Sequence, residues 1–353
     1  MATEFLQSSI LDRPYVLTSE LRSIAASTDD DRLTVSLACS GNVFFSVVIY
    51  AYNGKVELLD PGSLVEAYFR SKGMVSGIVS VSFGSAVKDI SFLYCEYSMP
   101  DAFHPENELL LSSSARRVHE GSRFTFAALP LHSVMRIDFK AFGLDENGIP
   151  VNADLNFSID ASKVYRHTYN FETSAYVKDF IKKNPDMVKV LYFSVSNGSR
   201  QLMCYLSPSP AWLTFAFMNV FNVQEYIDIE GAVKVRSETS RQTARCSGDI
   251  VQYDRRTDRT YQFSTGPLPD DEVESLAQLV SSHSVKLYAD GNYYDIVIED
   301  HTCDVSTEDD SLSVVKFTWR FKGRRPVRFN SALFGIQPTR RDIFSDEYSP
   351  EYE

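Results

Sequence analysis

A single helix-forming stretch lies among strand-forming segments in the last third of the chain, and this order restricts the fold more than any other sequence feature. The stretch runs from Asp270 to Ser282. Residues 260–264 before it alternate in polarity as a half-buried strand does, and two short apolar runs after it flank the turn signal Asp-Gly-Asn at residues 290–292. The predicted order is strand, helix and hairpin.

The same stretch has the pattern of an amphipathic helix. Val273, Leu276, Ala277 and Val280 share one face, and acidic residues fill the first turn, where negative charge suits the helix dipole. We therefore expect this helix to pack on a sheet.

Aromatic content favours a mainly β fold. The chain has 353 residues, of which 24 are Phe and 19 are Tyr, two residue types that are enriched in strands. At roughly 100–200 residues per domain, this length predicts two or three domains. We expect a β-rich protein with a few isolated short helices, in which an N-terminal β-sandwich-like domain precedes a second β-rich domain that contains the strand, helix and hairpin.

Four segments are predicted along the chain. Residues 1–14 show little periodicity and are assigned to an N-terminal arm. Residues 15–161, with many short alternating runs, form the sandwich-like domain, and residues 162–330 form the second domain with the helix at 270–282. Residues 331–353 form a C-terminal arm with an acidic tail.

Three local sequence signals predict particular elements, namely one turn and two helices. Asn53-Gly54 between two apolar runs predicts a type I′ hairpin turn. A helix is expected after Asp60-Pro61-Gly62, ending near Gly73, and another over Thr173–Lys183 before Asn184-Pro185.

Charge is unevenly distributed at the C-terminus. From Ser311 to Arg341 there are eight basic residues and no acidic ones, and from Asp342 to Glu353 five acidic residues and no basic ones. These segments are either solvated or an acidic arm docks on a basic patch of a neighbouring subunit. The candidate subunit-interface residues are Arg324, Arg325, Arg328, Arg340, Arg341, Asp346, Glu347, Tyr348, Glu351 and Tyr352.

A second arginine-rich region spans residues 236–259, with acidic residues interleaved. Charge pairing between neighbouring strands is favoured there over a polyanion site. The net charge of −12 also argues against a nucleic-acid binder, because phosphate contacts need clustered basic residues.

The sequence contains no motif for catalysis, a cofactor or a metal. The five cysteines are scattered and never spaced as Cys-x-x-Cys, and His301 and Cys303 supply too few ligands for a metal site. Acidic clusters fall where loops or helix starts are expected, and no Gly-x-Ser-x-Gly elbow occurs. With no signal peptide and no long apolar run in the sequence, we expect a protein made in a cytoplasm and not inserted in a membrane. Because catalytic motifs are missing, we also expect it to be non-enzymatic.

Trp212 and Trp319 both lie in strongly apolar strands. Burial in a core or an interface is favoured for them, and stacking on a surface glycan is the alternative.

The order of elements from Trp212 to Phe329 resembles structural proteins of phage and prophage tails and baseplates of Bacteroides-type hosts, and more loosely distal-tail and hub proteins. The resemblance rests on the run Phe217-Met218-Asn219-Val220-Phe221, the segment Phe263-Ser264-Thr265-Gly266-Pro267-Leu268-Pro269, the acidic helix and its hairpin, and a closing strand over residues 314–325. The segment Val43–Phe69 is similar to a unit of the same proteins.

This resemblance implies a non-enzymatic virion subunit that forms a ring or collar as a homo-oligomer, with other tail or baseplate proteins as partners. The alternative function is a carbohydrate-binding module or adhesin with a surface glycan as its ligand.

Overall fold

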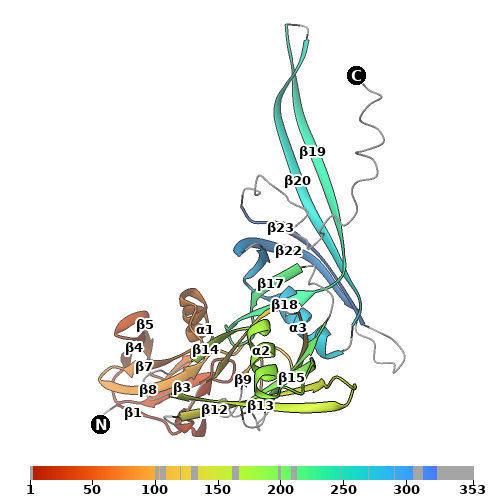
Figure 1. Cartoon of the computed structure of the whole chain (residues 1–353). Helices are drawn as coiled ribbons and strands as arrows, with labels where there is room; N and C mark the ends of the chain where they lie inside the picture. The colour runs from red at the N-terminus through yellow and green to blue at the C-terminus, as the bar shows by residue number, and fades with distance from the viewer. Residues whose placement is uncertain are drawn as a thin grey trace.

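The computed structural model describes residues 3–99, 103, 109–119, 121–128, 134–160, 167–197, 200–207, 213–247, 249–268, 270–289, 291–304 and 313–323. These residues form five sheets and three α-helices, so the expected β-rich fold with isolated short helices is confirmed. Three successive groups of elements each enclose a hydrophobic core (Figure 1).

The first unit is a β-sandwich in which two sheets share one core. A three-stranded sheet has the order β1 (Glu4–Phe5), β3 (Ser23–Ser27), β6 (Lys55–Leu59), and a five-stranded sheet has the order β2 (Val16–Leu17), β8 (Ala86–Leu93), β7 (Ser76–Phe83), β4 (Arg32–Cys39), β5 (Asn42–Tyr50). Alternate residues of both sheets point inward, as the period of two requires, and fill the core.

Helix α1 (Pro61–Lys72) connects β6 with β7 of this sandwich and lies where its sequence signals predict it. Proline occupies the first helical position, and Gly73 ends the helix with a φ of 61°, a conformation that glycine adopts without a steric penalty. Gly62 lies so close to the chain before it that an added Cβ would be 2.0 Å from the carbonyl oxygen of Thr18.

Two expectations for this unit are wrong in part. Residues 3–14 do not extend as an arm, because β1 pairs with β3, and Phe5 packs edge-on against Phe83 with ring centroids 5.4 Å apart. The Asn53-Gly54 turn has the predicted positive φ at both residues, yet β5 and β6 continue into different sheets.

The second unit contains two sheets and a helix. The larger sheet has the order β10 (Ala115–Val118), β16 (Arg200–Leu206), β15 (Lys189–Asn197), β12 (Val134–Leu144), β13 (Pro150–Asp160), and the smaller has the order β14 (His167–Glu172), β11 (Arg123–Ala128), β9 (Leu109–Leu110). Helix α2 (Thr173–Lys183) has its predicted bounds. Because β12 pairs with β15 on the other side of residue 161, the domain boundary predicted there is wrong.

The third unit is a seven-stranded sheet with one helix. Its order is β18 (Gln224–Ile229), β17 (Leu213–Met218), β21 (Val285–Ala289), β22 (Asn292–Asp304), β23 (Ser313–Phe321), β20 (Asp249–Leu268), β19 (Ala232–Cys246). Helix α3 (Asp270–Ser281) covers this sheet and buries Val273, Leu276 and Leu279 in its core. The predicted strand, helix and hairpin are confirmed, and the helix also contacts β10 of the second unit.

Candidate functional site

The three units meet at the turn between β17 and β18. Val220, Phe221 and Val223 in this turn pack in one buried cluster with residues of the first unit, such as Leu93, and of the second, such as Leu110. Phe221 is fully buried. The interior of this junction is therefore as apolar as a domain core, which favours a fixed arrangement of the units.

Two asparagines hold the turn in place. The side-chain oxygen of Asn219 accepts hydrogen bonds from the backbone N–H groups of Phe221 and Val223, at 2.9 and 3.0 Å. Asn222 has a φ of 56°, and its amide donates to the carbonyl oxygens of Met74 at 2.9 Å and Phe69 at 3.4 Å. The turn thus binds the C-terminal end of α1, where helix carbonyls lack partners within the helix.

A buried ion pair joins the second and third units beside this turn. The carboxylate of Glu225 accepts hydrogen bonds from the backbone N–H and the hydroxyl of Ser112, both at 2.8 Å, and from the amide of Asn219. The guanidinium of Arg116 pairs with the same carboxylate and donates to the carbonyl oxygen of Tyr226 at 3.1 Å. Neither charged side chain is more than 4% exposed, so each depends on the other for compensation.

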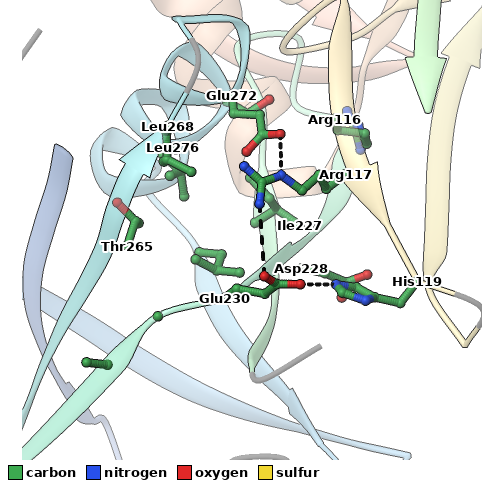
Figure 2. A pocket seen from close by; sticks show the side chains of 14 residues that line it. Arg116, Arg117, His119, Ile227, Asp228, Glu230, Thr265, Leu268, Glu272 and Leu276 are labelled. Atoms are coloured by element: carbon green, nitrogen blue, oxygen red, sulfur yellow. Dashed lines mark hydrogen bonds and ion pairs between the residues drawn. The ribbon is translucent and has the colours of Figure 1, made fainter. Parts of the chain in front are cut away.

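A cavity of about 420 Å³ lies next to this pair, between β10, β18 and α3 (Figure 2). Arg117 donates through its Nε to Glu272 at 2.8 Å and lies 3.9 Å from Glu230. Glu230 is also 3.8 Å from the Nε2 of His119. The cavity is thus bordered by a chain of charges that connects β10 with α3 and with the residue that follows β18.

Several polar groups in and around this cavity form hydrogen bonds with one another. The hydroxyl of Ser122 donates to Asp228 and accepts from the backbone N–H of His119, and the hydroxyl of Ser275 donates to Ser113. Within the ranges given above, no cluster of three or more His, Cys, Asp and Glu side chains is arranged to hold a metal ion. The observed contacts join the second unit to the third.

The distal parts of β19 and β20 form a two-stranded ribbon, which we call the arm: Arg236–Cys246 and Asp249–Thr260. Beyond Tyr261, which pairs with Trp319 of β23, the two strands pair only with each other in the described part of the chain. At about 3.4 Å per residue the arm is roughly 35 Å long. Figure 1 shows it projecting from the third unit.

The strand register of the arm places residues of like charge directly opposite each other at two positions. Arg241 lies directly opposite Arg255, and Glu238 directly opposite Asp258. Like charges at directly opposed positions destabilise a sheet. Directly opposed residues of the two arm strands therefore do not pair opposite charges.

The end of the arm exposes apolar side chains. Ile250 is 68% exposed, Tyr253 is 65% exposed and Val251 is 46% exposed. Cys246, at the same end, also has an exposed side chain. The arm thus exposes apolar side chains on both of its faces near its tip, away from the three cores.

The structure places one of the aromatic candidates. Trp319 is fully buried, with its ring stacked on Tyr261 at 4.3 Å between centroids, so it is a core residue and is not available to a glycan or a partner. Trp212 and all ten candidate interface residues between Arg324 and Tyr352 lie outside the described residues, as do residues 331–353 of the predicted C-terminal arm.

Sequence reasoning missed the ion pair and the arm. Asn219 interrupts the most apolar run of the chain and Glu225 closely follows it, which is a signal for buried polar contacts, but their partners are about 100 residues away in the sequence. The arm has a clearer signal, because residues 236–246 and 249–260 are polar over two long stretches with no continuous apolar face.

No helix in the described ranges is long and apolar enough to cross a membrane.

Comparison with known proteins gives little similarity. No family model matches the chain, and no curated protein matches it. A crystal structure of Dpr2 Ig1-Ig2 in complex with DIP-Theta Ig1-Ig3 covers 90% of this chain and 88% of its own, at 10% sequence identity and a TM-score of 0.21. A TM-score this low supports no conclusion about fold or function.

Proposed function

We propose that the chain is a non-enzymatic structural subunit that self-associates through its arm into a larger assembly. The observation that carries this proposal is the arm itself, a long two-stranded ribbon whose tip exposes apolar side chains that no described part of the chain covers. An isolated two-stranded ribbon is marginally stable in water, and exposed apolar clusters mark interaction sites. Contact with a partner would stabilise the arm and cover its tip.

The junction of the three units supports the same function. The buried turn at residues 219–223 and the Arg116–Glu225 pair favour a single rigid body from which the arm projects. A rigid body with a projecting contact element suits a closed homo-oligomer. The sequence resemblance to phage tail and baseplate proteins gives this assembly its proposed form, a ring or collar in a virion with other tail proteins above and below.

The carbohydrate-binding alternative has lost one of its two candidate residues, because Trp319 lies in a core.

The proposal is tested by placing charge at the arm tip. Size-exclusion chromatography with light scattering should show an oligomer for the wild type and a loss of at least tenfold in association constant for the double variant Ile250→Lys/Tyr253→Lys. Ile149→Lys is the matched control, because Ile149 is 57% exposed in a turn of the second unit. If the wild type is monomeric at every concentration, or if the arm variant assembles as well as the control, the proposal is wrong.

A further inference from the structure

Strand β5, at the edge of the five-stranded sheet of the first unit, is a second exposed apolar site besides the tip of the arm. It has β4 as its one neighbour in the sheet order given above, and its nine residues, Asn42–Tyr50, include no charge and no proline. Val47 and Val48 point to opposite faces because they are adjacent in a strand, yet both are more than a third exposed. Val43 and Tyr50 are 61% and 70% exposed.

This composition does not fit an edge strand that faces water. Edge strands of proteins are usually short, or carry lysine, proline or bulges that prevent pairing with another chain. The register of β5 against β4 shifts once, between Phe45 and Val43, but β5 has nine residues and carries no lysine or proline. A strand that is apolar on both faces is typical of a position inside a sheet. We infer that another strand pairs with the edge of β5 that has no partner among the described strands.

The arm of the same molecule is not in position to supply that strand. In Figure 1, β5 lies at the N-terminal end of the molecule and the arm projects from the third unit, well away from it. A second copy of the chain can supply it, because β19 is the last strand of its own sheet and its outer edge is unpaired in the described ranges.

Charge favours the same pairing. Exposed Asp29, Asp30 and Asp31 lie beside the end of β5, where the backbone N–H of Ala51 donates to the carbonyl oxygen of Asp31 at 2.8 Å. The arm has six arginines and four acidic residues, a net charge of +2, and since the whole chain carries −12, the rest of the chain carries −14. A positive arm is thus attracted to the negative remainder of a second copy.

We propose that the arm of one copy pairs along β5 of the next and extends its five-stranded sheet by β-strand addition. This inference rests on the proposed self-association and names its contact. One such contact covers both exposed apolar surfaces, whereas β5 pairing with itself leaves the arm tip exposed. Because the two surfaces differ, the contact is heterologous and generates a ring or an open polymer.

Two blocked variants test this contact by complementation. The arm variant Ile250→Lys/Tyr253→Lys keeps an intact β5, and Val48→Lys introduces charge on β5 but keeps an intact arm. Each alone should lose at least tenfold in association constant. Mixed in equal amounts they should form a one-to-one heterodimer that grows no further, because one intact arm meets one intact β5. Circular dichroism and thermal unfolding verify that both variants are folded.

A cross-link locates the contact. The exposed thiol of Cys246 and a new thiol in Val43→Cys should be joined between subunits by a short bismaleimide, and Cys246→Ser should abolish the product.

The outcomes separate the two proposals. Homodimers of one variant, a mixture that stays monomeric while the wild type assembles, or full assembly of Val48→Lys would overturn the pairing of arm with β5 and leave self-association standing. A wild type that never assembles overturns the proposed function.

Discussion

Replacing Glu225 with glutamine tests whether the buried ion pair holds the second and third units together. The substitution keeps the shape of the side chain and removes its charge, so Arg116, whose side chain is 4% exposed, loses the carboxylate that compensates it. Removing one partner of a buried pair costs about 3–5 kcal/mol, because the remaining charge is left without compensation. We expect Glu225→Gln to lower the free energy of unfolding by that amount.

The control is an ion pair of the same unit that water screens. Glu299 accepts from the Nε of Arg320 at 2.6 Å, and the two side chains are 29% and 49% exposed. Exposed pairs contribute less than about 1 kcal/mol, so Glu299→Gln should change stability little. Urea denaturation at pH 7, followed by fluorescence and circular dichroism, measures both variants. If the free energy of unfolding of Glu225→Gln lies within 1 kcal/mol of that of Glu299→Gln, the buried ion pair does not hold the second and third units together.

Three further predictions concern the local structure. Gly62→Ala should destabilise the first unit by about 3 kcal/mol, the upper end of the range for overpacking, because the added Cβ would meet a backbone carbonyl. Gly121→Ala should be tolerated, because an added Cβ there has no atom within 4 Å. Thermal unfolding compares the two variants. Burial acts to raise the pKa of Glu96, but hydrogen bonds and neighbouring positive charge lower it overall from 4.5. The contribution of Glu96 to stability is therefore present above pH 4.5 and is lost as the pH falls through the lowered pKa. Glu96→Gln should flatten that decline in acid denaturation, and parallel curves for the variant and the wild type would argue against it. Maleimide at neutral pH should label exposed Cys246 at least tenfold faster than Cys95, because burial raises the pKa of the Cys95 thiol to about 11. Peptide mass mapping measures the two rates, and equal rates would mean that Cys95 is accessible.

Elements defined by local signals could be predicted from the sequence. The helix over Thr173–Lys183 has its predicted bounds, and α1 begins at Pro61 and ends before Gly73, because caps and apolar spacing act within a few residues. The period of two identifies β23 in the same way, since alternate residues such as Phe317 and Trp319 enter the core.

Elements defined by distant pairing could not. The boundary expected near residue 161 fails because β12 selects β15, across the intervening α2, as a sheet neighbour. The Arg116–Glu225 pair and the contacts of Asn219 join residues about 100 positions apart. No short-range pattern encodes such contacts, because they depend on how complete sheets pack.

The edge position of β5 is another feature that depends on distant pairing. Its apolar run predicts a strand, and the Asn53-Gly54 turn predicts a hairpin with β6, but the two strands separate into the two sheets of the sandwich. The separation leaves one edge of β5 without a partner among the strands that the structure describes, which the sequence alone does not indicate. The combination of an apolar sequence and an edge position is the basis for proposing β5 as a contact surface.

The mass of the chain in solution tests the central proposal most directly. Sedimentation velocity of the wild type at micromolar concentrations should show a species whose mass is a multiple of 39.9 kDa, and the Ile250→Lys/Tyr253→Lys variant should sediment as the 39.9 kDa monomer. A wild type that sediments as a 39.9 kDa monomer at every concentration would contradict the proposal that this chain is a self-assembling subunit.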